Sequence, residues 1–90
     1  MAVIKFTRHL NRYYPSLGPV NIDQPTLRGV LDDVNKQFPG IIDYILDEQG
    51  NIRNHVHVFI GKEAIQDRSN TDIKVDKDSD IYVMQALSGG

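Results

Sequence analysis

The amino-acid sequence predicts an α+β roll, in which one main helix covers one face of a mixed sheet of four or five strands. Three observations support this prediction. Apolar and polar residues alternate with period two over residues 2–10 and again over residues 52–60, as in strands with one buried face. Residues 27–38 instead repeat their apolar side chains with a helical period. A helix that stands between strands in the chain packs on the sheet that those strands form.

The composition is that of a single small globular domain. Of the 90 residues, 40% are hydrophobic and 24% are charged, unlike the composition of a disordered chain. The formal net charge of −2 gives no general attraction to nucleic acid. The chain has no cysteine, which excludes a disulfide framework, a thiolate metal cluster and a cysteine nucleophile. No sustained apolar run or leader pattern is present, so we expect a cytoplasmic protein that binds neither membrane nor nucleic acid.

The amino-terminal quarter is expected to hold two strands. The alternation predicts a first strand over Ala2–Leu10. The following stretch, Asn11–Gln24, is the least periodic part of the chain, and two prolines and a glycine interrupt it. Within it, Val20–Ile22 is expected to form a short second strand.

The main helix has a clear start and a clear stop. Thr26 is a candidate N-cap, because its hydroxyl can accept a hydrogen bond from a backbone N–H of the first turn. Pro39-Gly40 predicts an end close to Phe38. Gly29 costs the helix roughly 1 kcal/mol relative to alanine. The apolar stripe expected to cover the sheet consists of Leu27, Val30, Leu31, Val34 and Phe38.

The second half of the chain is expected to hold two or three strands. Gly50-Asn51 is a hairpin-turn signal, so strands are predicted on both sides of it, the first in the apolar stretch 41–45. In the second, residues 52, 56, 58 and 60 should face the helix. Residues 61–63 predict a turn and residues 63–77 a polar surface connection. The last strand is expected to begin at Ile81 and to lead to Gly89-Gly90. We therefore predict a domain over residues 1–86 and a flexible tail over residues 87–90.

Several segments of the chain match the pattern of a known family. They are residues 26–31 with 38–40, 46–53, 55–60 and the tail Ala86-Leu87-Ser88-Gly89-Gly90. Through these segments the chain resembles the β-grasp, ubiquitin-like sulfur-carrier family of the MoaD/ThiS type. The family commonly has an Asn-Gly-Glu turn where this chain has Gly61-Lys62-Glu63, and a proline where it has Gln85, which leaves the pathway open.

The resemblance implies that the carboxyl terminus is the working group of a protein that is not itself an enzyme. An adenylating enzyme of the MoeB/ThiF type would use ATP to activate Gly90, a sulfur donor protein would convert it to a thiocarboxylate, and a synthase would accept the sulfur for a cofactor or metabolite such as molybdopterin, thiamine or cysteine. The carrier would bind no cofactor. Gly89 and Gly90 would thread a narrow channel in the partner, since glycine has no Cβ to clash there.

Two other functions use the same fold. A ubiquitin-like modifier would join Gly90 to a lysine of a target protein, and a plain binding module would leave the terminus unused. The partner-binding residues are expected on the outer sheet face and in the tail. They are Phe59, Met84, Leu87 and Ser88, although Ser88 is also a small polar residue that simply ends the strand.

Other polar clusters are expected to be structural. His55 and His57 share one strand face and, with His9, allow a metal site, but a solvated sheet face is favoured. Adjacent Asp32 and Asp33 diverge on a helix and cannot share a site. The acidic residues 72, 76, 78 and 80 lack the glycine and glutamate of a calcium loop. Tyr13-Tyr14, near Arg8 and Arg12, is expected to pack on an edge strand, with base stacking as the alternative.

Overall fold

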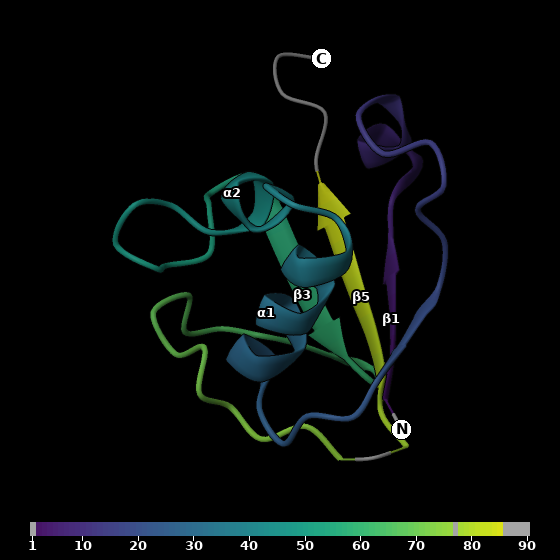
Figure 1. The fold of residues 1–90 in the computed structure, drawn as a ribbon. Coiled ribbons are helices and arrows are strands. Elements are labelled where there is room, and N and C mark those ends of the chain that lie inside the picture. The colour runs from purple at the N-terminus through teal and green to yellow at the C-terminus, as the bar shows by residue number, and fades with distance from the viewer. Residues whose placement is uncertain (1, 77, 86–90) are drawn as a thin grey trace.

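A computed structural model describes residues 2–76 and 78–85. The five strands form one mixed sheet in the order β2-β1-β5-β3-β4, with α1 across one face (Figure 1). The predicted α+β roll is confirmed, with the larger of the two expected strand numbers. The elements, in chain order, are β1 (Ala2–Phe6), the 3₁₀ helix η1 (Arg8–Arg12), β2 (Val20–Ile22), α1 (Leu27–Gln37), α2 (Ile42–Ile45), β3 (Val56–Ile60), β4 (Glu63–Ala64) and β5 (Asp80–Gln85).

Strand β5 occupies the middle of the sheet. It pairs parallel with β1, where Ile4 lies opposite Ile81, and antiparallel with β3, where Val58 lies opposite Val83. The last strand of the described chain is therefore supported along both edges. Unlike an edge strand, it has hydrogen-bonded neighbours on both sides.

The main helix follows its prediction closely. Thr26 is the N-cap, and its Oγ1 accepts a hydrogen bond of 3.2 Å from the backbone N–H of Gly29. Leu27, Val30, Leu31 and Val34 are buried, and the helix stops before Phe38. A Cβ at Gly29 would lie 2.9 Å from Oε1 and 3.1 Å from Cβ of Gln24, so the glycine leaves room for this side chain.

The first strand is shorter than predicted. β1 ends at Phe6, and η1 occupies residues 8–12 instead. On the outer edge of β1, the short strand β2 pairs only with residues Ala2 to Ile4. Beyond Ile4, β1 has no strand partner on that edge. Local bonds replace it: the backbone N–H groups of Tyr13 and Tyr14 donate to the Leu10 carbonyl. One turn of helix is enough to bury the Leu10 side chain completely.

The apolar stretch after α1 forms a short helix, so the strand predicted there is wrong. Residues 42–45 form α2, and the fully buried side chains Ile41 and Ile45 are four residues apart, as on one helix face. The predicted turn does form, with Gly50 at a φ of 83°. The two sides of the turn meet only in one bridge between Leu46 and Ile52 rather than in a hairpin.

The strand after this turn starts later than its alternation suggested, at Val56, but its buried side is as predicted. Val56 and Val58 are buried beneath the helix, while Ile60 is partly buried. The 61–63 turn forms with a positive φ at Gly61. The polar connection that follows includes the short strand β4 and buries Val75, so it is less superficial than expected.

Candidate functional site

The candidate site predicted from the sequence divides into two parts. Gly89, Gly90, Leu87 and Ser88, and the boundary between the domain and its tail, lie outside the described residues. Phe59 and Met84 lie within them, on the sheet face opposite α1.

Strict alternation along β5 defines the two faces. Ile81, Val83 and Gln85 point into the protein, while the intervening residues point outward. Tyr82 is 38% exposed and Met84 is 36% exposed, so both present apolar surface to solvent. The prediction that Met84 belongs to the outer face is confirmed.

The neighbouring strand adds the other half of this surface. Phe59 of β3 is partly buried and lies opposite Tyr82, and His57 lies opposite Met84. On the other side of β5, Lys5 of β1 is exposed and also pairs with Tyr82. We define the outer patch as Phe59, Tyr82 and Met84. Tyr82 was not among the predicted residues, although it has the same parity as Met84 and the alternation could have revealed it.

The end of β5 is fixed by a hydrogen bond to α2. Gln85 is 8% exposed, and its Nε2 donates to the carbonyl of Tyr44 at 3.2 Å. Within the described residues its Oε1 has no hydrogen-bond partner. On the opposite edge, the Thr7 backbone N–H donates to the Val83 carbonyl at 3.2 Å. The strand end is therefore held by α2 on one side and by the start of η1 on the other.

The predicted placement of the two adjacent tyrosines on an edge strand is wrong. Tyr13 and Tyr14 follow η1 and join an aromatic cluster near the end of β5. Tyr13 stacks on Tyr44 with ring centroids 5.1 Å apart, and Tyr14 meets Tyr44 edge-on at 6.2 Å. The Tyr14 hydroxyl donates to the Pro39 carbonyl, and partial burial raises the pKa of Tyr14.

Of the two histidines predicted to share one strand face, only His57 lies in β3, and the Arg68 guanidinium lies beside it. Nη1 of Arg68 donates to the carbonyls of Arg53 and Val56, and its Nη2 lies 3.4 Å from Nδ1 of His57. A fixed positive charge at this distance opposes the binding of a metal cation by His57. Over residues 2–76 and 78–85, no group of three His, Cys, Asp or Glu residues could hold a metal ion.

The helix carboxylates have separate partners. Asp32 pairs with Arg28 at 3.1 Å, whereas Asp33 accepts from Nε2 of Gln24 at 2.9 Å. They point to different neighbours, in keeping with the expectation that they share no site.

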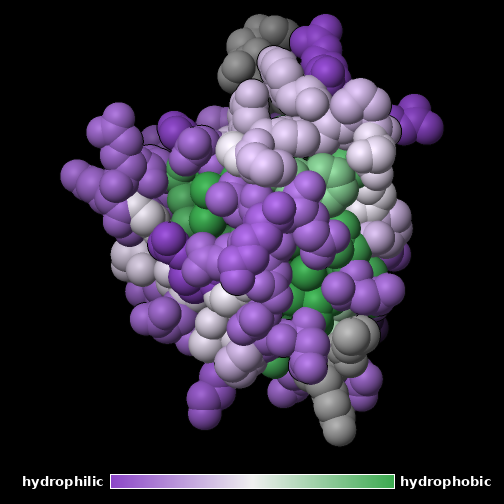
Figure 2. All heavy atoms as spheres, in the orientation of Figure 1, coloured by the Kyte–Doolittle hydropathy of each residue, from purple (hydrophilic) through white to green (hydrophobic). Residues whose placement is uncertain are grey.

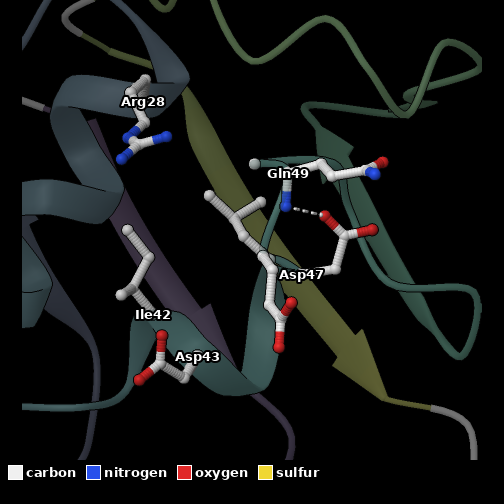
Figure 3. Close-up of a pocket in the computed structure, with 8 residues that line it drawn as sticks. Arg28, Ile42, Asp43, Asp47 and Gln49 are labelled. Atoms are coloured by element: carbon white, nitrogen blue, oxygen red, sulfur yellow. Dashed lines mark hydrogen bonds between the residues drawn. The ribbon is translucent and has the colours of Figure 1, made fainter.

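A pocket of about 250 Å³ lies between the first turn of α1, the α2 helix and the turn at residues 47–50 (Figure 3). Arg28 lines it, together with Ile42, Asp43, Asp47 and Gln49. The Asp47 carboxylate accepts hydrogen bonds from the backbone N–H groups of Gln49 and Asn51, at 2.9 and 3.0 Å. This carboxylate serves the local turn, and the pocket offers no arrangement of a nucleophile with a base.

The described part of the chain contains no helix long and apolar enough to cross a membrane. No protein-family model matches the sequence, and no curated protein sequence matches it.

Solved structures do match. A mixed five-stranded sheet covered by one main helix, with β5 in the middle, defines a β-grasp fold of the ubiquitin-like kind. The chain is similar to one in the crystal structure of the Amycolatopsis orientalis BexX/CysO complex, with a TM-score of 0.87, 17% identity and full coverage of both chains. It is also similar to Mycobacterium tuberculosis CysO, an antigen, with a TM-score of 0.84, 15% identity and coverage of 97% of this chain and 100% of that one.

A third similar structure is small archaeal modifier protein 1 from Haloferax volcanii. Its TM-score is 0.75 at 19% identity, and the match covers 99% of this chain and 98% of that one. At these identities the likeness establishes the fold, and the β-grasp prediction is confirmed.

Proposed function

We propose that this protein is a sulfur carrier that acts through the carboxylate of Gly90. The observation that carries the proposal is the central strand β5, which is paired with β1 up to Val83 and with β3 up to Gln85, four residues before Gly89. Four or five extended residues span at most roughly 18 Å. A terminus that follows a central strand within this reach suits delivery into a partner's buried site.

The chemistry begins with a poor electrophile. An adenylating enzyme of the MoeB/ThiF type joins the Gly90 carboxylate to AMP and releases pyrophosphate from ATP. A persulfide sulfur of a donor protein then forms a C–S bond as AMP leaves. A thiol cleaves the resulting acyl disulfide, which leaves a thiocarboxylate on Gly90 and a disulfide on the donor side. A synthase accepts this sulfur in biosynthesis.

The carrier itself is a co-substrate in this scheme and needs no bound cofactor. ATP is consumed by its partner, and we propose that the reaction takes place in the cytoplasm. Phe59 and Met84, now joined by Tyr82, form an apolar surface for the adenylating enzyme. Leu87 and Ser88 would contact that enzyme along the channel that receives the two glycines.

A modifier function is the second candidate. Its support is that three of the similar structures are of small archaeal modifier protein 1, from Haloferax volcanii and Methanosarcina acetivorans. A modifier would use the same adenylate but would transfer Gly90 to a lysine amine. The two candidates therefore differ in product and share the activation step.

Intact mass of the protein purified from its own source tests the proposal. A sulfur carrier gives a free chain in which one terminal oxygen is replaced by sulfur, whereas a modifier gives a set of heavier conjugates. A chain that extends beyond Gly90, or that carries neither change while the sulfur pathways are active, would contradict both. As a matched pair, Gly89→Val should block activation because of its bulk and restricted backbone, while Lys62→Ala in the remote turn should not.

A further inference from the structure

A basic and aromatic surface surrounds the carboxyl end of β5, separate from the outer patch. Figure 1 shows η1 and α2 on either side of the end of this strand. Arg8 and Arg12 of η1 are exposed, as is Tyr13 immediately after it. Tyr44 of α2 completes the group. We define the β5-end surface as Arg8, Arg12, Tyr13 and Tyr44.

The segment that carries three of these residues is well anchored. Leu10 is fully buried and Leu17 is 7% exposed, so the segment is fastened to the core at two points. Nδ2 of Asn11 donates to the Leu17 carbonyl at 2.8 Å and to the Tyr14 carbonyl at 3.2 Å. A surface held in this way loses little conformational entropy when a partner binds.

The exposed aromatic ring is itself held in place. Tyr13 is 52% exposed, the largest exposure among the exposed large hydrophobic side chains of the described residues. It nevertheless stacks on Tyr44, with an interplanar angle of 19°. Beneath them Tyr14 packs edge-on against Phe38 at 6.0 Å. Pale side chains of intermediate hydropathy gather at this end of the molecule in Figure 2. Fixed tyrosines beside arginines are the side chains most enriched in protein interfaces.

The charge of the chain is unevenly distributed around this surface. All 12 Asp and Glu residues follow residue 22, whereas Lys5, Arg8 and Arg12 precede it. At the opposite end of β5, Asp80 begins the strand, and the pocket between Asp23 and Asp76 lies beside the preceding loop. Carboxylates therefore lie near the start of the central strand, whereas Arg8 and Arg12 lie near its end, where Asp43 of α2 is the neighbouring carboxylate.

The two guanidiniums favour a protein carboxylate over nucleic acid as their partner. Each arginine can bind a carboxylate through two parallel hydrogen bonds. A nucleic-acid site needs several phosphate contacts, whereas this end of an acidic chain offers only a few cations. Charge complementarity thus points to an acidic protein surface.

We propose that the β5-end surface docks on an acidic rim around the site where the activating protein receives Gly90. This inference rests on the proposed function and names the surface of the partner. The arginines would steer the two proteins together and fix the orientation of β5. Tyr13 would provide an apolar contact between the two arginines and the partner. The outer patch would then be a second, uncharged contact.

A peptide titration tests the chemical preference of the surface without any enzyme. The probe is a short synthetic peptide of Glu and Asp around one Phe, added at low salt and followed by the backbone amide NMR shifts. We expect shifts in residues 8–14 and 42–45. The double variant Arg8→Glu with Arg12→Glu should weaken binding by at least about tenfold. The milder pair Arg8→Gln with Arg12→Gln repeats the test if the first variant is unstable.

The matched control reverses two exposed charges elsewhere. Lys36→Glu with Lys62→Glu changes the net charge by the same amount outside the β5-end surface, and should leave peptide binding within about twofold. Equal losses in both double variants would overturn the proposal. Tighter binding of a single-stranded oligothymidine at the same salt would also overturn it, as would salt-sensitive self-association of the chain without peptide binding.

Kinetics with a MoeB/ThiF-type enzyme separate this inference from the proposed function. In pyrophosphate exchange, the arginine reversal should raise the KM for the carrier at least about tenfold and leave kcat within about twofold, because the effect is on encounter. An unchanged KM would refute the docking surface while the carrier function stands. Absence of exchange with the unaltered chain would refute the carrier function, and the peptide titration would still decide whether the surface selects acidic protein.

Discussion

The inward and outward sides of β5 differ in what they contribute. Ile81 and Val83 are buried under α1, with exposed fractions of 1% and 0%. Tyr82 and Met84, from the same strand, are more than a third exposed. The backbone hydrogen bonds are common to both sets, so the difference lies only in side-chain direction. Stability and partner binding can therefore be altered separately by changing neighbouring residues of one strand.

The largest expected effect is on the helix that covers the inward side. Leu31 is 1% exposed in the middle of α1. Leu31→Ala should lower the free energy of unfolding by about 2–5 kcal/mol, through lost burial and the cavity left behind. Urea denaturation followed by circular dichroism measures it. A cost under about 0.5 kcal/mol would place Leu31 on a surface and break the distinction between the faces.

Two adjacent residues of β5 give a sharper test. Val83→Ala should cost about 2 kcal/mol, since two buried methyl groups are lost, whereas Met84→Ala should cost about 0.5 kcal/mol or less. For the affinity for the adenylating enzyme, measured by calorimetry, Met84→Ala should cause the larger loss and Val83→Ala the smaller one. Met84→Ala, like Phe59→Ala, should weaken binding by more than it lowers stability. Unchanged affinity in both outer-patch variants would remove that patch from the interface.

Removal of the N-cap hydroxyl of α1 should have the next largest effect on stability. Thr26→Ala removes the acceptor for the Gly29 N–H and should destabilise the fold by about 1 kcal/mol. Thr26→Ser keeps the acceptor and serves as the control, with a smaller loss expected. Chemical denaturation of the two variants side by side makes the comparison. Equal losses would mean that the hydroxyl is not the stabilising group.

The smallest effect concerns the loop after β4. Ser69 donates through its hydroxyl and its backbone N–H to Asp67, at 2.6 and 3.0 Å, which lowers the pKa of this carboxyl below its ordinary 3.8. Its stabilising contribution is therefore present above pH 3.8 and is lost as the pH falls through the lower, folded-state pKa. Asp67→Asn should be slightly less stable than the unaltered chain at neutral pH, and thermal melts should converge in acid. A gap that widened in acid would contradict this.

Local patterns predicted the parts of the fold that depend on local interactions. The cap at Thr26, the stripe of α1 and the inward parity of Val56 and Val58 each follow from neighbours a few residues away. β2 occupies the residues predicted for it, 20–22, where two apolar side chains flank Asn21. The order of the strands could not be derived in this way, because pairing of β1 with β5 joins residues almost a whole chain apart.

The errors have physical causes as well. Residues 41, 42, 44 and 45 suit a helix turn as well as a strand, and the burial of Ile41 and Ile45 decided between them. Because β2 is short, β1 has no strand partner on its outer edge beyond Ile4, and η1 forms after this point. In the candidate site, Phe59 and Met84 were predictable from parity. The stack of Tyr13 on Tyr44 joins distant segments, and no sequence pattern signals it.

Pyrophosphate exchange by the adenylating enzyme, with and without one residue added after Gly90, is the most direct test of the central claim. We expect the extended chain to support no exchange, because its α-carboxylate no longer sits on Gly90, while its melting temperature stays unchanged. The same residue added before Met1 should leave the exchange intact. Undiminished exchange by the chain extended beyond Gly90 would contradict both the carrier and the modifier function, and would leave a β-grasp binding module as the explanation.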